Sequence, residues 1–115
     1  MKPLVSLISP CYNGESYITR FLDSILNQTY PNLELLIIND GSTDRTEEII
    51  LNYESDFILK GYTLIYIYQD NAGQSAAINK ALPIFKGKYL SWVDSDDYLP
   101  VDAIEKKGKL YGGPS

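Results

Sequence analysis

Three carboxylates lie within four residues near the end of the chain, in the stretch Asp94-Ser95-Asp96-Asp97. Like charges grouped in this way repel one another unless a positive group compensates for them, and residues 89–100 contain no lysine or arginine. Mg²⁺ and Mn²⁺ prefer oxygen ligands and often bind one or two carboxylates together with substrate phosphate oxygens. The stretch therefore indicates a metal-assisted nucleotide site. A solvated acidic turn is the simpler alternative, because Asp-x-Asp is a short pattern that also occurs by chance.

The composition removes several other kinds of chemistry. The 115 residues are enough for one compact domain with a core of its own. The chain has no histidine, which excludes Ser-His-Asp catalysis and histidine-ligated metals. Its single cysteine, Cys11, excludes a disulfide framework, and we expect a small strand-end residue there because no base is available to activate the thiol. The net charge of −5, without a basic cluster, argues against a nucleic-acid partner.

We expect no targeting signal in the first residues. The apolar run after Pro3 is short and is broken by Ser6 and Ser9, so it predicts neither a signal peptide nor a membrane span. We expect a cytoplasmic protein. The alternative is a cytoplasmic protein that associates peripherally with the inner face of the membrane.

Apolar segments of two different periods alternate along the chain. Four β-prone segments are predicted to be strands, at residues 3–9, 33–38, 62–68 and 88–93. Three segments with a helical period lie between them, at residues 16–29, from 44 to about 53, and at 74–82. Asn13 or Ser16 is predicted to cap the first helix, Asp44 and Glu47 have the spacing of a capping box for the second, and a loop is expected around residues 54–61.

This alternation predicts an α/β fold, a three-layer doubly wound and mostly parallel sheet with about four strands and three helices. Residues 1–103 are expected to form the domain, and residues 104–115 are expected to form a frayed tail.

Polar side chains follow every predicted strand at its carboxyl end. In an open parallel sheet, ligands bind outside these ends. Polar and acidic residues gather there and not at the opposite end, which predicts a functional site. The four stretches concerned are Pro10-Cys11-Tyr12-Asn13, Asn39-Asp40-Gly41-Ser42, Asp70-Asn71-Ala72-Gly73 and Asp94-Ser95-Asp96-Asp97.

Each stretch offers a functional and a structural interpretation. Tyr12 could stack on a flat base or be one of ten tyrosines at the surface. Asp40 could accept a hydrogen bond from a base imide N–H or cap the second helix. Gly41 and Gly73 could admit a ligand to the backbone or only permit a positive φ. The helix that begins at Gly73 could direct its first N–H groups at a phosphate.

Three other ligand-binding classes fail on their motifs. A nicotinamide-dinucleotide domain requires G-x-G-x-x-G after the first strand, and residues 10–15 do not supply it. A calcium loop beginning at Asp94 requires glycine where Leu99 stands. A flavodoxin-like phospho-acceptor domain would carry acids after the first strand, where Ser9-Pro10-Cys11 has none.

Five linked motifs resemble the family 2 inverting glycosyltransferases of the GT-A fold. The match spans residues 3–102 in the same order and spacing. The motifs are Pro10-Cys11-Tyr12-Asn13, Gln28-Thr29-Tyr30, Asn39-Asp40-Gly41-Ser42-Thr43-Asp44, Asn71-Ala72-Gly73-Gln74-Ser75-Ala76-Ala77-Ile78-Asn79 and Asp94-Ser95-Asp96-Asp97.

The resemblance implies a nucleoside diphosphate sugar as donor, usually linked to UDP. It assigns Tyr12 and Asp40 to the base, and Asp94 and Asp96 to Mn²⁺ or Mg²⁺, with Asp96 as the metal-coordinating carboxylate. The metal would neutralise charge on the departing diphosphate. The implied substrate-binding residues are Pro10, Tyr12, Asn13, Glu15, Asp40, Asn71, Gly73, Ser75, Asn79, Asp94 and Ser95.

The chain departs from the family pattern in two places. The family often has Asp-Asp where this chain has Asn39-Asp40. Family members also continue for roughly another hundred residues, which hold the acceptor site and a general base. Glu105 is the only acid after Asp102, so no catalytic residue is assigned.

We therefore expect the donor-binding half of a glycosyltransferase, truncated or a fragment, with an exposed sheet edge beside the fourth strand through which it self-associates. A non-catalytic nucleotide-sugar binding module, or an inactive remnant, is the alternative. The acceptor, a sugar or a lipid-linked glycan, is left open.

Overall fold

Strands and helices alternate along the chain, as the periodicity predicts. The structure is a computed structural model that describes residues 2–96 and 98–105. The elements are β1 (Val5–Cys11), α1 (Ile18–Leu26), β2 (Leu33–Asp40), α2 (Thr46–Asn52), α3 (Glu54–Lys60), β3 (Thr63–Gln69), α4 (Gln74–Ala81) and β4 (Tyr89–Trp92). The strands form one parallel sheet in the order β3-β2-β1-β4. The predicted α/β class is confirmed.

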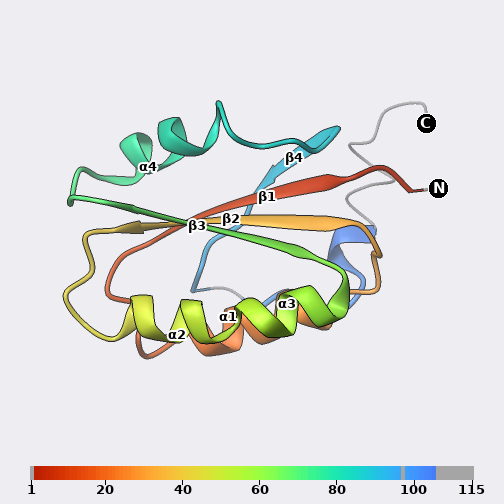
Figure 1. The fold of residues 1–115 in the computed structure, drawn as a ribbon, viewed down its shortest axis with the longest axis horizontal. Helices are drawn as coiled ribbons and strands as arrows, with labels where there is room; N and C mark the ends of the chain where they lie inside the picture. The colour runs from red at the N-terminus through yellow and green to blue at the C-terminus, as the bar shows by residue number, and fades with distance from the viewer. Residues whose placement is uncertain (1, 97, 106–115) are drawn as a thin grey trace.

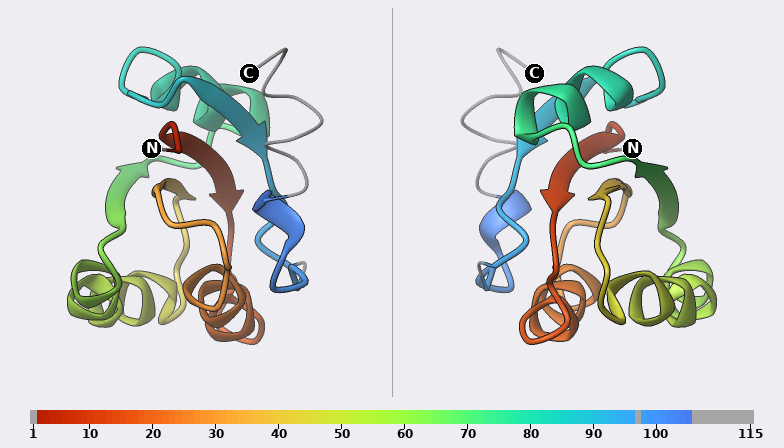
Figure 2. Two further views of the ribbon diagram at one scale, coloured as in Figure 1. Left: turned by 90° about the vertical axis from the view of Figure 1, so that its right-hand side faces the viewer. Right: turned by 90° about the vertical axis from the view of Figure 1, so that its left-hand side faces the viewer.

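The sheet is covered on both faces, so the fold has three layers. Helices α1, α2 and α3 lie on one face and α4 lies on the other (Figures 1 and 2). Side chains alternate between the two faces along a strand. Leu7 accordingly belongs to the larger core under α1–α3, and Ile8 belongs to the smaller core under α4. Strand β2 is buried along its whole length, as expected of a central strand between two helical layers.

The chain reverses its direction across the sheet at β1. It moves outward from β1 to β2 and β3, and then returns through α4 to form β4 on the other side of β1. In open α/β sheets, ligands bind outside the carboxyl ends of the strands where the order reverses. The topology therefore places the crevice at the ends of β1 and β4.

Residues 54–61 are not the predicted loop. Residues 54–60 form α3, and Gly61 ends the helix with a φ of +84°. The fully buried Phe57 provides the physical reason, because it anchors this turn in the larger core. Between the strands there are thus four helices, α1 to α4, where the sequence predicted three. Tyr53 and Phe57, four residues apart, were the helical signal that the sequence offered.

The predicted helix caps are also wrong. No side chain caps α1, whose preceding residue is Tyr17, and the Gly14 carbonyl accepts the N–H groups of Tyr17 and Ile18 instead. The proposed capping box does not form either. Asp44 accepts a hydrogen bond from the N–H of Thr46, only two residues on, at 3.0 Å. Glu47 accepts one from the Tyr66 hydroxyl at 3.0 Å, so its side chain points to β3 rather than to the helix start.

Strand β1 extends two residues beyond its predicted end and includes Pro10. Proline in a central strand removes a ladder hydrogen bond and is normally avoided. Strand β4, however, pairs with β1 only from Val5 to Ile8. Pro10 therefore lies where β1 has a neighbour on one side only.

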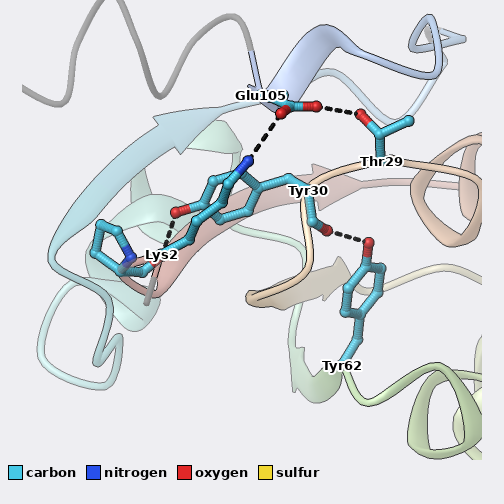
Figure 3. Close-up of polar contacts among 6 residues, drawn as sticks. Lys2, Thr29, Tyr30, Tyr62 and Glu105 are labelled. Atoms are coloured by element: carbon cyan, nitrogen blue, oxygen red, sulfur yellow. Dashed lines mark hydrogen bonds and ion pairs between the residues drawn. The ribbon is translucent and has the colours of Figure 1, made fainter.

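The first two residues of the predicted tail pack onto the amino end of the sheet. Ile104 is fully buried, and the Glu105 carboxylate lies between the Lys2 amino group at 2.8 Å and the Thr29 hydroxyl at 2.8 Å (Figure 3). Residues 106–115 lie outside the described range. In the described residues, no helix has the length and apolarity that a bilayer crossing requires.

Among the described strands, β4 is one edge of the sheet. Its last residue, Trp92, is half exposed. Self-association through this edge stays a prediction.

Candidate functional site

An open cleft with a volume of about 390 Å³ lies at the carboxyl ends of β1 and β4. Six of the predicted site residues contribute to its walls, and three further residues do so as well. The predicted ones are Pro10, Tyr12, Asp40, Asp94, Ser95 and Asp96, and the others are Cys11, Tyr17 and Gln74.

The acidic turn is attached to β1 by its middle residue. The Val93 N–H donates to the Ile8 carbonyl at 3.1 Å, and the buried Ser95 hydroxyl donates to the Pro10 carbonyl at 3.1 Å. The flanking residues Asp94 and Asp96 are exposed. Neither carboxylate forms a hydrogen bond or ion pair with another described residue. The turn therefore presents two unsatisfied carboxylates to the cleft.

These two carboxylates fit a hard divalent cation. Mg²⁺ sites typically use one or two carboxylates and complete the coordination with phosphate oxygens and water. No group of three or more potential metal-ligating side chains occurs among residues 2–96 and 98–105, and Asp97 lies outside that range. Two carboxylates do not make a closed protein site, so phosphate oxygens or water would have to complete the coordination of a cation held here.

The loop that carries Tyr12 is fastened to the loop after β2. Asn13 has a φ of +47°, its side-chain oxygen accepts the Thr43 N–H at 2.8 Å, and its own N–H donates to Ser42 Oγ at 2.8 Å. Glu15 Oε1 accepts the Arg45 N–H at 2.9 Å. The side chains of Asn13 and Glu15 therefore hold the two loops together. Tyr12 remains 49% exposed at the mouth of the cleft.

Asp40 is buried at the end of β2, and it organises the turn after β3 rather than capping α2. Its carboxylate accepts hydrogen bonds from Gln69 Nε2 at 2.8 Å, from the Ala72 N–H at 2.8 Å and from the Gly73 N–H at 3.0 Å. Burial alone would raise the pKa of Asp40, but these three hydrogen bonds together hold the pKa below its ordinary value of 3.8. Asp40 is therefore ionised at neutral pH.

Gly41 allows this turn to approach β2. A Cβ at position 41 would lie 2.6 Å from the Asn71 backbone nitrogen, and the φ of Gly41 is +74°. Gly41 therefore allows the backbone of the neighbouring turn to come close.

The predicted residues around α4 are less tightly associated with the cleft. Asn71, Gly73, Ser75 and Asn79 are not among the residues that line it, whereas Gln74 is. The Gly73 N–H, which could have faced a phosphate, is already donated to Asp40.

Asn39 has a structural explanation for its departure from the family pattern. Its side-chain nitrogen donates to the Tyr66 hydroxyl at 3.0 Å, while its oxygen accepts the Ser42 N–H at 3.1 Å. An ionised aspartate could not donate the first of these bonds.

Tyr17 is the cleft residue that lies outside every motif identified in the sequence, and the sequence analysis missed it. Its hydroxyl donates to the Tyr12 carbonyl at 3.1 Å, and a Cβ at Gly14 would lie 2.9 Å from its ring. Burial chiefly raises the pKa of Tyr17, and the nearby Ser95 hydroxyl lowers it in part. Tyr17 thus connects the Tyr12 loop to the acidic turn. It directly precedes α1, and the apolar period that begins at Ile18 gave no signal for it.

Cys11 also lines the cleft, but it is not a nucleophile. Burial raises the pKa of its thiol to about 12, and the charges of Asp44 and Asp40 add to the shift. The thiol stays protonated at neutral pH, as the absence of a histidine base led us to expect.

Comparison with known proteins identifies the family to which the chain belongs. The family described as "Glycosyl transferase family 2" matches residues 6–107, and the chain therefore belongs to this family. An uncharacterized glycosyltransferase of Rickettsia prowazekii is 44% identical over 103 residues, which cover 90% of this chain and 30% of that protein. The chain thus spans about a third of the length of this curated relative.

Solved structures show the same fold. A fragment of TarS of Staphylococcus aureus (residues 1–349), in complex with UDP, matches with a TM-score of 0.82 and 32% identity, over 97% of this chain and 32% of that fragment. The same TarS fragment is also known in complex with UDP-GlcNAc. A mannosyltransferase of Pyrobaculum calidifontis, in complex with GDP-Man and Mn²⁺, matches with a TM-score of 0.76 and 29% identity, over 87% of this chain and 29% of that chain. The fold is therefore of the GT-A type.

Proposed function

We propose that the cleft binds a nucleoside diphosphate sugar, UDP-linked, together with Mn²⁺ or Mg²⁺. The observation that carries the proposal is the pair Asp94 and Asp96, which are exposed and unsatisfied in the same cleft as Tyr12 and Asp40. The complexes of TarS with UDP and UDP-GlcNAc support a uridine nucleotide, and the Mn²⁺ complex of the mannosyltransferase supports a divalent cation.

The base is assigned to the β1–β2 side of the cleft. The exposed ring of Tyr12 offers a stacking surface, and stacking on an aromatic ring contributes about 1–3 kcal/mol per base. Asp40 Oδ2 accepts one hydrogen bond, from the Gly73 N–H, and a carboxylate oxygen can accept a second. A base imide N–H could therefore use Asp40 without breaking the turn that Asp40 holds.

The diphosphate is assigned to the β4 side, where Asp94 and Asp96 would hold the metal. When bound there, the metal would neutralise negative charge on the departing diphosphate. The proposed role of this chain in the reaction is to bind and orient the donor, with Pro10 and Ser95 fixing the turn against β1.

The sugar is assigned to the open side of the cleft next to α4. Gln74 lines the cleft there, and Asn71, Ser75 and Asn79 are the predicted residues next to it along the chain, although they do not themselves line the cleft. Transfer to an acceptor also requires a base for the acceptor hydroxyl. Glu105 does not serve the cleft, since it is paired with Lys2 at the opposite end of the sheet. Binding without transfer is therefore the second candidate function for the chain by itself.

Calorimetric titration of UDP, with and without Mn²⁺, tests the proposal. We expect Mn²⁺ to enhance UDP binding and Asp96→Asn to remove this enhancement, with a loss of at least about 100-fold, because even indirect partners of metal ligands contribute 10- to 100-fold to metal affinity. Free uridine should bind the variant as it binds the wild type.

Asp56→Asn, which changes an exposed carboxylate on α3, is the matched control and should retain the enhancement. A wild-type chain that is folded but never binds UDP would refute the proposal, and stronger binding of GDP than of UDP would refute the choice of base. Release of free sugar or its transfer to an acceptor separates a transferase from a binding module.

A further inference from the structure

Gln28 belongs to one of the family-like motifs, yet its side chain is buried away from the cleft. It is 2% exposed and lies just beyond the end of α1. Its amide nitrogen donates to the Ser24 carbonyl at 3.1 Å and to the Pro100 carbonyl at 2.7 Å. Its amide oxygen accepts the Ile104 N–H at 3.0 Å. Two of these three hydrogen bonds therefore reach a segment more than 70 residues away in the sequence.

This segment, residues 98–105, follows the acidic turn. Helix α1 and the residues just after it hold the segment at several points. The Arg20 guanidinium lies 5.1 Å from the centre of the Tyr98 ring, and the Thr29 N–H donates to the Val101 carbonyl at 2.7 Å. Leu99 packs against the larger core. In both views of Figure 2 the segment after β4 lies beside α1.

The acidic turn is thus held at both of its ends. Val93 binds β1 directly in front of it, and Ser95 binds β1 from within it. Gln28 binds Pro100 and Ile104 behind it. Asp94 and Asp96 lie between the two attachments and form no hydrogen bonds or ion pairs of their own with described residues.

We propose that Gln28 is a positioning residue for the divalent cation, which it serves by fixing the segment behind Asp94 and Asp96. This inference rests on the proposed function of the cleft. An uncharged amide suits the task because one planar group supplies both a donor for the Pro100 carbonyl and an acceptor for the Ile104 N–H. Without it, two partly buried backbone groups would lack partners, and the segment would shift toward water to satisfy them.

Gln28→Met tests this role because methionine is similar in length but forms neither hydrogen bond. We expect the enhancement of UDP binding by Mn²⁺ to fall about tenfold, as is typical when a group that orients a metal ligand is removed. Binding of free uridine, which needs no metal, should change less than about twofold. Hydrogen exchange of the amides in residues 98–105 should become faster.

Thr29→Val is the matched control. It removes only the hydroxyl that donates to Glu105, at the neighbouring position, and leaves the backbone hydrogen bond to Val101 in place. It should retain the wild-type Mn²⁺ enhancement. If Gln28→Met does not fold, Arg20→Met decides the question, since it loosens the same segment from the exposed side of α1 and should lower the enhancement two- to threefold.

The outcomes separate this inference from the proposed function. A wild-type chain without Mn²⁺-enhanced UDP binding overturns both. A wild-type enhancement that Gln28→Met or, failing that, Arg20→Met leaves unchanged overturns the role of Gln28 alone.

Discussion

The two ends of the sheet differ in how their polar groups are paired. At the amino end, the buried Glu34 carboxylate accepts the Ser6 hydroxyl and the Lys86 N–H, both at 2.6 Å. The Tyr30 hydroxyl donates to the Pro3 carbonyl, and the Tyr62 hydroxyl donates to the Tyr30 carbonyl (Figure 3). At the carboxyl end, Asp94 and Asp96 have no such partners among the described residues. The polar groups named at the amino end are paired with one another, whereas two carboxylates at the carboxyl end are left exposed in the cleft.

This difference corrects the sequence-based expectation that polar and acidic residues gather at one end only. Lys2, Glu34 and Glu105 lie at the amino end and are as polar as the residues of the cleft. Polar side chains with partners stabilise a fold, whereas polar side chains without partners are available for binding. What distinguishes the carboxyl end is the pair of carboxylates, Asp94 and Asp96, that lack partners among the described residues, and not polarity as such.

The largest effect is expected for Glu34→Ala at the amino end, and it is a loss of folding stability. The change leaves the Lys86 N–H without its acceptor and removes a buried side chain, so the free energy of unfolding should fall by about 2–4 kcal/mol. Affinity for UDP in the folded fraction should stay unchanged. Urea denaturation and UDP titration measure the two quantities.

Glu34→Gln is the control for this prediction. Because its amide oxygen can still accept a hydrogen bond, the loss in the free energy of unfolding should be clearly smaller. A loss of UDP affinity in either folded variant would mean that the two ends are not independent.

Tyr12→Ala, at the carboxyl end, should have the opposite pair of effects: it should weaken ligand binding and leave the stability of the fold nearly unchanged. Affinity for free uridine should fall by about 1–3 kcal/mol, because the stacking surface is removed. The free energy of unfolding should change by less than about 0.5 kcal/mol, since the ring is half exposed. Tyr68→Ala, an equally exposed tyrosine on β3, is the control and should leave uridine affinity intact. If only diphosphate affinity fell in Tyr12→Ala, the assignment of the base to Tyr12 would be wrong.

The smallest effect is a pH dependence that arises at Asp40. Its folded pKa lies below 3.8, the ordinary value expected for the unfolded chain, so between these two values the unfolded state binds more protons. The stabilisation from Asp40 is therefore complete well above pH 3.8 and is lost as the pH falls through the folded pKa. Urea denaturation between pH 6 and pH 2 measures the free energy of unfolding. As the pH falls, this free energy should decrease less steeply in Asp40→Asn than in the wild type. Equal slopes would exclude Asp40 as a source of this dependence.

The sequence predicted much of this fold because its signals are local. Apolar runs of different period predicted the four strands and α1 and α4 to within a few residues. It failed at α3, where the anchor is one side chain, Phe57, that packs against distant elements. It also ended β2 too early, because Asn39 and Asp40 have the composition of a turn but are paired with β3.

The candidate site could be predicted in part for a similar reason. Strand ends of a parallel sheet meet at one edge, so the alternation of elements was enough to bring Tyr12, Asp40, Asp94 and Asp96 to one cleft. Tyr17 was missed because nothing in its neighbourhood along the chain distinguishes it from a surface tyrosine.

The sequence by itself determined the class of fold, the edge of the sheet that carries the cleft and the types of side chain that gather there. Only the tertiary structure decided which polar groups are already used. Asp40 holds the turn at Ala72 and Gly73, Asn13 and Glu15 hold the loop at residues 42–45, and Gln28 holds the segment behind the acidic turn. The reason is physical: these hydrogen bonds join residues about 30 to 76 positions apart, and such pairs exist only after the sheet and its helices have packed.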